Sequence, residues 1–230
     1  MAATPPVADP ASSVIVLRPA AGRFETLMVR RRPVGFFGDL VVFPGGGVDD
    51  LDRSTLARET VACEADDHDH RSAALRELAE ETGLIVGGEG AESGRGLKGR
   101  ALFADLKARG VSLRGDDLTP VSRWVTPEAA PRRFDTRFYL LAVDDPPPVA
   151  VDEDELVGFE WVAPERALSR HADGEWPMVL PTVAHLRWLS RQESIAEAVA
   201  SARGGDGPPG RPELVRDGGL IPTPTPGGRP

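Results

Sequence analysis

The sequence is poor in cysteine, in basic charge and in long apolar runs, and each shortage excludes a class of protein. Cys63 is the only cysteine among the 230 residues, so no disulfide can form within the chain, and a reducing compartment is expected. No apolar run approaches the roughly 20 residues of a membrane-spanning helix. The first ten residues lack the basic start and apolar stretch of a signal peptide. The sequence therefore predicts a cytoplasmic protein with no membrane partner.

The charge balance argues against nucleic acid as a partner. The chain has 27 basic and 36 acidic residues and a formal net charge of −9, whereas general nucleic-acid binding needs a basic surface. An acidic protein can still bind a small polyphosphate through a metal ion or a local cluster of arginines. Two arginine clusters are present, at residues 30–32 and in RRFDTRFY at 132–139.

Turn residues divide the chain into strands and helices in a mixed order. Short apolar stretches predict strands at 12–17, 24–31, 40–43, 121–126, 132–143 and 156–162. Helices are predicted at 56–62, 71–82, 101–110 and 164–170, and a long helical segment at 181–200. This order favours a single mixed α/β domain over residues 12–202. The Ala/Pro-rich residues 1–11 and the Gly/Pro-rich residues 203–230 are predicted to be a flexible N-terminus and a flexible tail.

One predicted helix gathers its acidic residues on one side. Residues 76–84 read RELAEETGL, and at 100° per residue Glu77, Glu80 and Glu81 fall within about a 100° arc. Clustered anions destabilise a helix mildly unless a cation lies among them. Two interpretations remain open at this point: a solvated acidic face, or oxygen ligands gathered for Mg²⁺ or Mn²⁺.

The same helix, together with FPGGGVD at 43–49, resembles the Nudix box, G-x5-E-x7-R-E-U-x-E-E-x-G-U, where U is apolar. The second half is matched at Arg76, Glu77, Leu78, Glu80, Glu81, Gly83 and Leu84. In the first half, Gly46 takes the place of the leading glycine, and Asp52 stands where the family prefers glutamate. Asp52 precedes Arg76 by 24 positions instead of 8, so the box carries 16 extra residues, an insertion placed at 53–68. Asp49, Asp50 or Glu64 are therefore alternatives to Asp52.

Other stretches over roughly residues 12–190 resemble the Nudix-motif-19 branch, which is similar to the coenzyme A and acyl-coenzyme A diphosphatases. They include GFFGDLVVFPGGGVDD, RWVTPE, PRRFDTRFYL and MVLPT. The resemblance implies an α/β/α sandwich with a mixed central sheet. It also implies hydrolysis of coenzyme A or its thioesters to 3′,5′-ADP and a 4′-phosphopantetheine product. The alternatives are a pyrophosphatase acting on NADH or ADP-ribose, and a non-catalytic ligand sensor.

The resemblance also assigns roles to residues. It places Mg²⁺ or Mn²⁺ on Glu77 and Glu81, with Glu80 as a further ligand and the Gly46 carbonyl as another. One of these glutamates or the distant Glu155 would act as general base. Arg76 either orients a ligand glutamate or forms an ordinary surface salt bridge.

Arginines are the candidates for substrate binding. In RRFDTRFY, Arg133 and Arg137 share one face of a predicted strand, and they would either bind phosphates or lie on an exposed edge strand. Arg31, in the cluster before the GFFG loop, is a second candidate. The expected partner is a small nucleotide, and a homodimer remains open.

Overall fold

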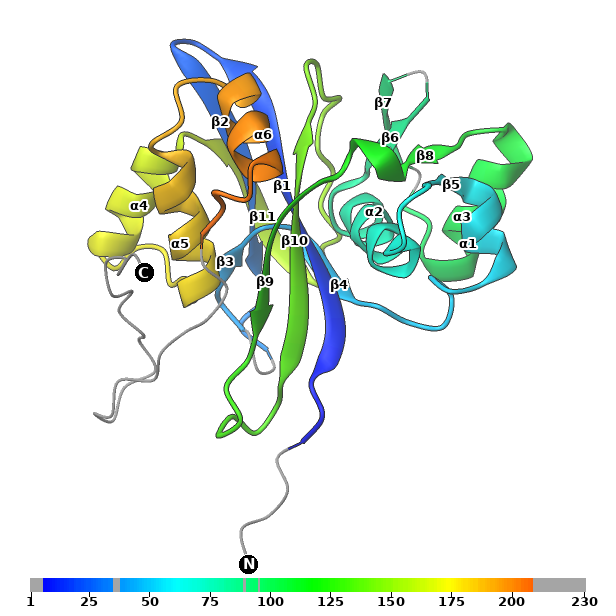
Figure 1. Cartoon of the computed structure of the whole chain (residues 1–230), viewed down its shortest axis with the longest axis horizontal. Helices are drawn as coiled ribbons and strands as arrows, with labels where there is room; N and C mark the ends of the chain where they lie inside the picture. Colours follow the sequence, from blue (N-terminus) through cyan, green and yellow to red (C-terminus); the bar gives the residue numbers. More distant parts are fainter. Residues whose placement is uncertain (1–5, 35–37, 89, 95, 209–230) are drawn as a thin grey trace, which may run out of the picture.

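A computed structural model describes residues 6–34, 38–88, 90–94 and 96–208. A seven-stranded sheet stands between two layers of helices (Figure 1). Its members are β1 (Asp9–Ala20), β2 (Arg23–Arg31), β3 (Val41–Val42), β4 (Gly45–Gly47), β9 (Thr119–Val125), β10 (Phe134–Ala142) and β11 (Leu156–Val162). The strand order is β11-β2-β1-β10-β9, with β3 beside β2 and β4 beside β1. The predicted tail lies outside the described residues from 209 onward, as does the N-terminus up to residue 5.

The central sheet is mixed. β1 runs parallel to β10 but antiparallel to β2 and β4. Successive side chains of a strand point to opposite faces, so β1 contributes to two cores at once. Val14 and Val16 pack with one apolar cluster, and Ile15 and Leu17 pack with the other. The predicted α/β/α sandwich with a mixed central sheet is therefore confirmed.

Six α-helices among the described residues cover the two faces. One side carries α1 (Thr55–Thr60), α2 (His68–Thr82) and α3 (Gly99–Arg109), and the other carries α4 (Pro164–Ala172), α5 (Leu180–Leu189) and α6 (Ile195–Arg203) (Figure 1). α2 ends at Gly83, whose φ of 68° is the left-handed cap that glycine adopts without a Cβ penalty. None of the helices in the described part of the chain is long and apolar enough to cross a membrane.

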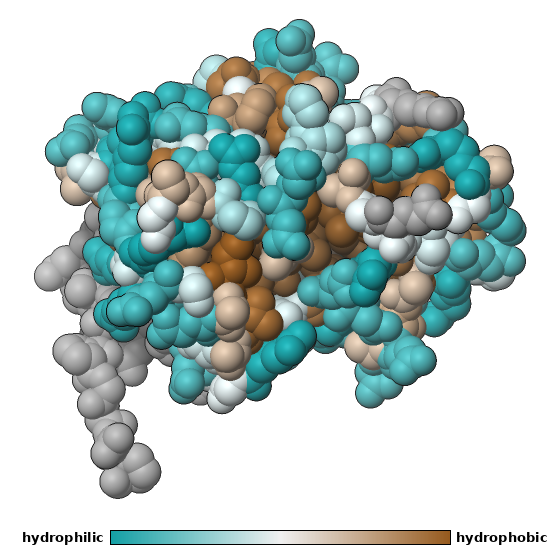
Figure 2. Space-filling model, turned by 90° about the horizontal axis from the view of Figure 1, so that it is seen from above, coloured by the Kyte–Doolittle hydropathy of each residue, from teal (hydrophilic) through white to brown (hydrophobic). Residues whose placement is uncertain are grey.

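The insertion inside the box joins a second, smaller sheet. This sheet has the order β5-β8-β6-β7 and consists of β5 (Val61–Ala62), β6 (Leu84–Gly87), β7 (Gly90–Ser93) and β8 (Leu113–Arg114), followed by the 3-10 helix η1 (Gly115–Asp117). Ala57 and Val61 of the insertion belong to the same apolar cluster as Leu78 of α2. The insertion therefore shares the core of the domain. Viewed from above, apolar side chains gather in the middle of the molecule, between more hydrophilic flanks (Figure 2).

Several boundaries differ from the sequence prediction, among them the start of β1 and the break between α5 and α6. β1 begins at Asp9, so residues 9–11, which the sequence assigns to the flexible N-terminus, pair with residues 134–136 of β10. The long helical segment predicted at 181–200 is two helices, because α5 ends at Leu189 and α6 starts after Ser194. The Ser194 hydroxyl accepts a hydrogen bond from the Glu197 amide at 3.1 Å, which is a helix N-cap.

A buried histidine joins α5 to the central sheet. His185 is fully buried, and its Nδ1 donates to the Pro181 carbonyl at 2.6 Å. Its Nε2 lies 2.7 Å from the Ser122 hydroxyl, which accepts a hydrogen bond from Trp124 Nε1 at 3.1 Å. The ring stacks on Phe138 with 4.3 Å between centroids. Burial lowers the pKa of His185 to about 4, so the ring is neutral near pH 7 and its Nε2 can accept from the Ser122 hydroxyl.

Acid is therefore expected to destabilise the fold through His185. The unfolded chain protonates this ring near its ordinary pKa of 6.5, whereas the folded protein does so near 4. The free energy of unfolding should fall as the pH is lowered from 6.5 to 4, by at most about 3 kcal/mol. Urea unfolding at several pH values measures this fall. His185→Gln should flatten the slope, and His171→Gln at a partly exposed position should keep it; equal slopes for both variants would contradict the assignment.

Candidate active site

Helix α2 is packed on nearly every side. The side chain of Arg76 is 5% exposed and that of Glu81 is 2% exposed. Glu77 and Glu80 are only slightly more open, at 15% and 12%. The acidic side of the helix is therefore not a solvated surface.

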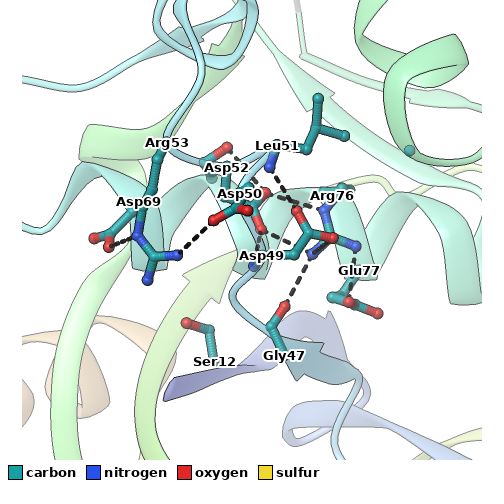
Figure 3. Close-up of polar contacts among 12 residues, drawn as sticks. Ser12, Gly47, Asp49, Asp50, Leu51, Asp52, Arg53, Asp69, Arg76 and Glu77 are labelled. Atoms are coloured by element: carbon teal, nitrogen blue, oxygen red, sulfur yellow. Dashed lines mark hydrogen bonds and ion pairs between the residues drawn. The ribbon is translucent and has the colours of Figure 1, made fainter. Parts of the chain in front are cut away.

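Arg76 is the centre of a buried ion-pair network (Figure 3). Its Nε and Nη2 donate to the two carboxylate oxygens of Asp52, at 3.0 and 2.9 Å. Nη2 also donates to the Gly47 carbonyl at 2.9 Å, and Nη1 donates to Glu77 Oε1 at 2.8 Å. Such a bidentate, charge-assisted pair fixes the orientation of both groups. The pair with Asp52 is buried, so it differs from the ordinary surface salt bridge considered from the sequence, and Arg76 also bonds to the Glu77 carboxylate.

Asp52 is the acid that partners Arg76, in spite of the insertion. Its side chain is fully buried, whereas Asp49 is 58% exposed and lies 3.6 Å from Arg76. Asp50 is fully exposed and pairs with Arg53 at 3.7 Å. The inserted residues 53–68 lie between Asp52 and the body of α2, and α2 brings Arg76 back beside Asp52. The longer spacing along the chain therefore does not separate Asp52 from Arg76 in space.

Glu77 and Glu81 lie against the glycine turn of β4. A Cβ placed on Gly46 would lie 2.5 Å from the Glu77 carboxyl carbon, so the absence of a side chain lets that carboxylate approach. Glu81 Oε2 accepts from the Gly45 amide at 3.0 Å, and its Oε1 accepts from Arg31 Nη1 at 3.3 Å. Gly45 itself packs on β1, where a Cβ would lie 2.3 Å from the Ser12 carbonyl oxygen. The backbone of the turn therefore needs glycine at Gly45, whereas glycine at Gly46 makes room for the Glu77 carboxylate.

Glu80 points elsewhere. Its Oε1 accepts from the Gly99 amide at the start of α3, at 2.7 Å, and it lies 3.6 Å from Arg76 Nη1. The carboxylate of Glu80 thus bonds to the start of α3, while Glu77 and Glu81 contact the glycine turn. Within the described residues, no three His, Cys, Asp or Glu side chains are grouped so that they could hold a metal ion. The three-glutamate ligand set predicted from the sequence is not assembled in this conformation.

The two carboxylates at the turn are difficult to ionise. Burial, together with the neighbouring carboxylates of Glu80 and Glu155, raises the pKa of Glu77 to about 7 against the lowering effect of Arg76. Burial also raises the pKa of Glu81 to about 8 against the Gly45 hydrogen bond. Two buried anions with this little compensation favour a cation between them.

Glu155 faces the same region from the loop before β11. Its side chain is 44% exposed and bonds to Lys98 Nζ at 3.1 Å. The segment that carries it is tied to the end of α2, because the amides of Ala150 and Asp152 donate to the carbonyls of Thr82 and Glu81, each at 3.0 Å. The candidate base predicted from the sequence therefore lies at the rim of the carboxylate site.

Of the three predicted substrate-binding arginines, the structure places only Arg31 at this site. Arg137 pairs with Asp67 at 3.4 Å, ten residues before Glu77 and so about 15 Å away along the helix axis. Arg133 donates to the carbonyls of Thr126 and Pro6, at 3.1 and 2.7 Å. The structure does not bring these two arginines together with the carboxylates.

Sequence reasoning did not single out Lys98 or Asp152. Lys98 lies in GRGLKG, a stretch without regular structural signals, and Asp152 lies in an acidic loop. The chain has two lysines, and this rarity was the one signal that could have drawn attention to Lys98.

Comparisons with known proteins agree with this geometry. The family model for the NUDIX domain matches residues 8–180, well over half of the chain. The chain belongs to the Nudix family. A crystal structure of a NUDIX hydrolase from Alicyclobacillus acidocaldarius is 33% identical, with a TM-score of 0.74, and the match covers 84% of this chain and 96% of that one.

Two curated Nudix relatives are longer than this chain. Nudix hydrolase 7 of Caenorhabditis elegans is 30% identical over an alignment 185 positions long, which covers 77% of this chain and 59% of that protein. The human acyl-coenzyme A diphosphatase NUDT19 is 27% identical over an alignment 258 positions long, which covers 85% of this chain and 66% of that protein. The chain thus spans less than two thirds of the length of either relative. Family membership supports the assignment of the chain as a Nudix hydrolase.

Nudix hydrolases generally use a divalent metal ion and act on small nucleotide-derived substrates. The donor chemistry here fits Mg²⁺ or Mn²⁺, because Glu77 and Glu81 offer hard carboxylate oxygens in a buried place where their charge is poorly compensated. These two glutamates would hold the ion. Glu80 would join them only after releasing the Gly99 amide.

Gly46→Ala is expected to lower turnover without unfolding this Nudix domain. The added methyl group would meet the far end of the flexible Glu77 side chain at 2.5 Å, so the carboxylate would move and the backbone would stay in place. A displacement of this size should reduce kcat by about 10- to 100-fold.

Gly47→Ala is the matched control, because a Cβ there has no heavy atom within 4 Å. Steady-state kinetics and urea unfolding of both variants measure the effect. Equal activity of the two alanine variants would contradict a role for the approach of Glu77 to the turn.

Proposed function

We propose that this Nudix hydrolase uses a divalent metal ion to hydrolyse the diphosphate of coenzyme A or an acyl-coenzyme A. The products are 3′,5′-ADP and a 4′-phosphopantetheine species. The observation that carries the hydrolytic part is the buried pair Glu77 and Glu81 at the Gly45–Gly47 turn, with Arg31 beside it. The similarity to the human acyl-coenzyme A diphosphatase supports the choice of substrate.

A bound divalent ion neutralises phosphate charge and lowers the pKa of a water molecule. The chain's own residues prepare the place for this chemistry. Asp52 and Arg76 hold Glu77, and the Gly45 amide holds Glu81, so both carboxylates are fixed before substrate arrives. This pre-organisation reduces the reorganisation needed at the moment of reaction.

Arg31 and Glu155 would contribute to the same hydrolytic step in different ways: Arg31 binds a phosphate oxygen, and Glu155 accepts a proton. The guanidinium of Arg31 is 32% exposed, so it can exchange its bond to Glu81 for a phosphate oxygen. Of the four glutamates near the site, Glu155 is the most exposed, and water can reach its carboxylate. In this proposal, water attacks one phosphorus atom, Glu155 takes the proton of that water, and the bridging oxygen leaves with the other phosphate.

A direct assay tests the assignment. The protein would be incubated with coenzyme A, an acyl-coenzyme A, NADH, ADP-ribose and nucleoside triphosphates, with Mg²⁺, with Mn²⁺ and with a chelator. Mass spectrometry should detect 3′,5′-ADP from the coenzyme A samples that contain metal. If coenzyme A survives while NADH or ADP-ribose is cleaved, the substrate is another nucleoside diphosphate derivative. If none of these compounds is cleaved, the result favours a non-catalytic ligand sensor.

A further inference from the structure

Lys98 stands between the start of α3 and the loop that carries Glu155. Its Nζ donates to Glu155 Oε1 at 3.1 Å and to a carboxylate oxygen of Asp152. The Asp152 hydrogen bond raises the pKa of Lys98, so the ammonium form persists at all ordinary pH values. The side chain is 42% exposed, so it remains accessible at the rim of the site.

These contacts belong to a set that joins three segments: the start of α3, the loop at 152–155 and the last turn of α2. Glu80 accepts a hydrogen bond from the Gly99 amide at 2.7 Å, next to Lys98 in the chain. The Asp152 amide donates to the Glu81 carbonyl at 3.0 Å. Removal of the ammonium group would break only the link between the start of α3 and the loop, because the bonds to Glu80 and Glu81 are made by backbone amides.

The backbone and the side chain of Glu155 are held in different ways. Its amide donates to the Asp152 carbonyl at 3.1 Å, and its carbonyl accepts from the Arg32 amide at 2.9 Å. The carboxylate stands at the end of a flexible side chain, and within the described residues Lys98 is the cation bonded to it. A half-exposed glutamate without such a partner populates several rotamers.

We propose that Lys98 is a positioning residue that holds the Glu155 carboxylate and its loop at the rim of the Glu77–Glu81 site. The inference rests on the proposed function for its effect on turnover, where Glu155 takes the proton of the attacking water. Its effect on the loop does not depend on any substrate.

Lys98→Met should lower kcat about tenfold and leave KM within about twofold. Lys98→Arg should restore most of the rate, because a guanidinium reaches both carboxylates. In a Glu155→Gln background, Lys98→Met should lower kcat little further, since the carboxylate that Lys98 positions is already absent. A rise in KM with an unchanged kcat would assign Lys98 to substrate binding and overturn the proposal.

Lys107 is the matched control, since it is the other lysine of the chain and lies on α3, directly before which Lys98 stands. Its Nζ bonds to Glu59 at 2.6 Å, and the pair is exposed to a similar degree, at 51% and 48%. Lys107→Met should leave kcat unchanged. Equal rates for Lys98→Met and Lys107→Met would overturn the proposal.

Amide hydrogen exchange separates this inference from the proposed function. Lys98→Met should accelerate exchange at the Glu155 and Leu156 amides, which both donate to the Asp152 carbonyl, by about tenfold. The Ala150 amide, bonded to Thr82 of α2, should keep its rate. If no diphosphate is hydrolysed, the proposed function fails while faster exchange still supports the positioning of the loop. Unchanged exchange overturns the positioning whatever the activity.

Discussion

Glu81→Gln is expected to reduce diphosphate hydrolysis by about 10³-fold, the scale of losing one pre-organised electrostatic group. Glutamine keeps the size of the side chain and can still accept the hydrogen bond from the Gly45 amide, at 3.0 Å in the unchanged protein. It removes the negative charge that would hold the divalent ion. Because burial already disfavours that charge, the neutral side chain should cost little stability.

Steady-state rates measure the loss, and urea unfolding together with circular dichroism checks the fold. Glu92→Gln is the control, because Glu92 lies on β7, is 41% exposed and pairs only with Arg109 among the described residues. Its rate should match that of the unchanged protein. Turnover of Glu81→Gln within threefold of the control would remove Glu81 from the metal site and with it the central element of the proposed function.

The largest effect on stability is expected at Arg76. Arg76→Met would leave the fully buried Asp52 carboxylate without its cation, and breaking a buried pair in this way costs about 3–5 kcal/mol. Most of this cost comes from the stranded charge. Asp52→Asn in the same chain should therefore recover about 2 kcal/mol, since the asparagine oxygen can still accept from the Asp49 amide and its amide nitrogen can donate to the Ser72 hydroxyl.

Arg53→Met is the control for these two variants. Arg53 directly follows Asp52 in the loop but is 45% exposed, and its partners are Asp50 and Asp69 at 3.7 and 3.3 Å. Exposed pairs of this kind contribute about 1 kcal/mol or less. Urea unfolding gives the free energy of unfolding of the unchanged protein, of Arg76→Met with and without Asp52→Asn, and of Arg53→Met. A loss below about 1 kcal/mol for Arg76→Met would show that the pair does not hold the turn against α2.

The two halves of the box show how far local patterns reach. Arg76 and the glutamates after it follow a fixed helical spacing, and helix geometry brings them together wherever the helix lies. Asp52 has no such relation to Arg76, because 24 positions and a folded insertion separate them. The sequence left Asp49, Asp50 and Glu64 as alternatives, and only the fold places Asp52 in full burial against the guanidinium.

Arg137 and Glu80 illustrate what a pattern leaves open. Alternation correctly puts Arg133, Asp135 and Arg137 on one face of a strand, but which neighbour covers that face depends on the position of α2. The N-terminal end of α2 places Asp67 beside Arg137, while the carboxylate site forms at the other end. Glu80 lies on the acidic side as predicted, yet the start of α3 takes its carboxylate.

The sequence by itself determined the family, most strands of the central sheet and the crowding of three acids on one helix, because these follow from residue spacing along a single element. Tertiary structure alone decided that Glu77 and Glu81 meet the glycine turn, that Asp52 pairs with Arg76 and that Lys98 reaches Glu155. Each of these contacts joins segments brought together by the burial of a shared apolar core. Their energy depends on desolvation, which exists only once that core has formed.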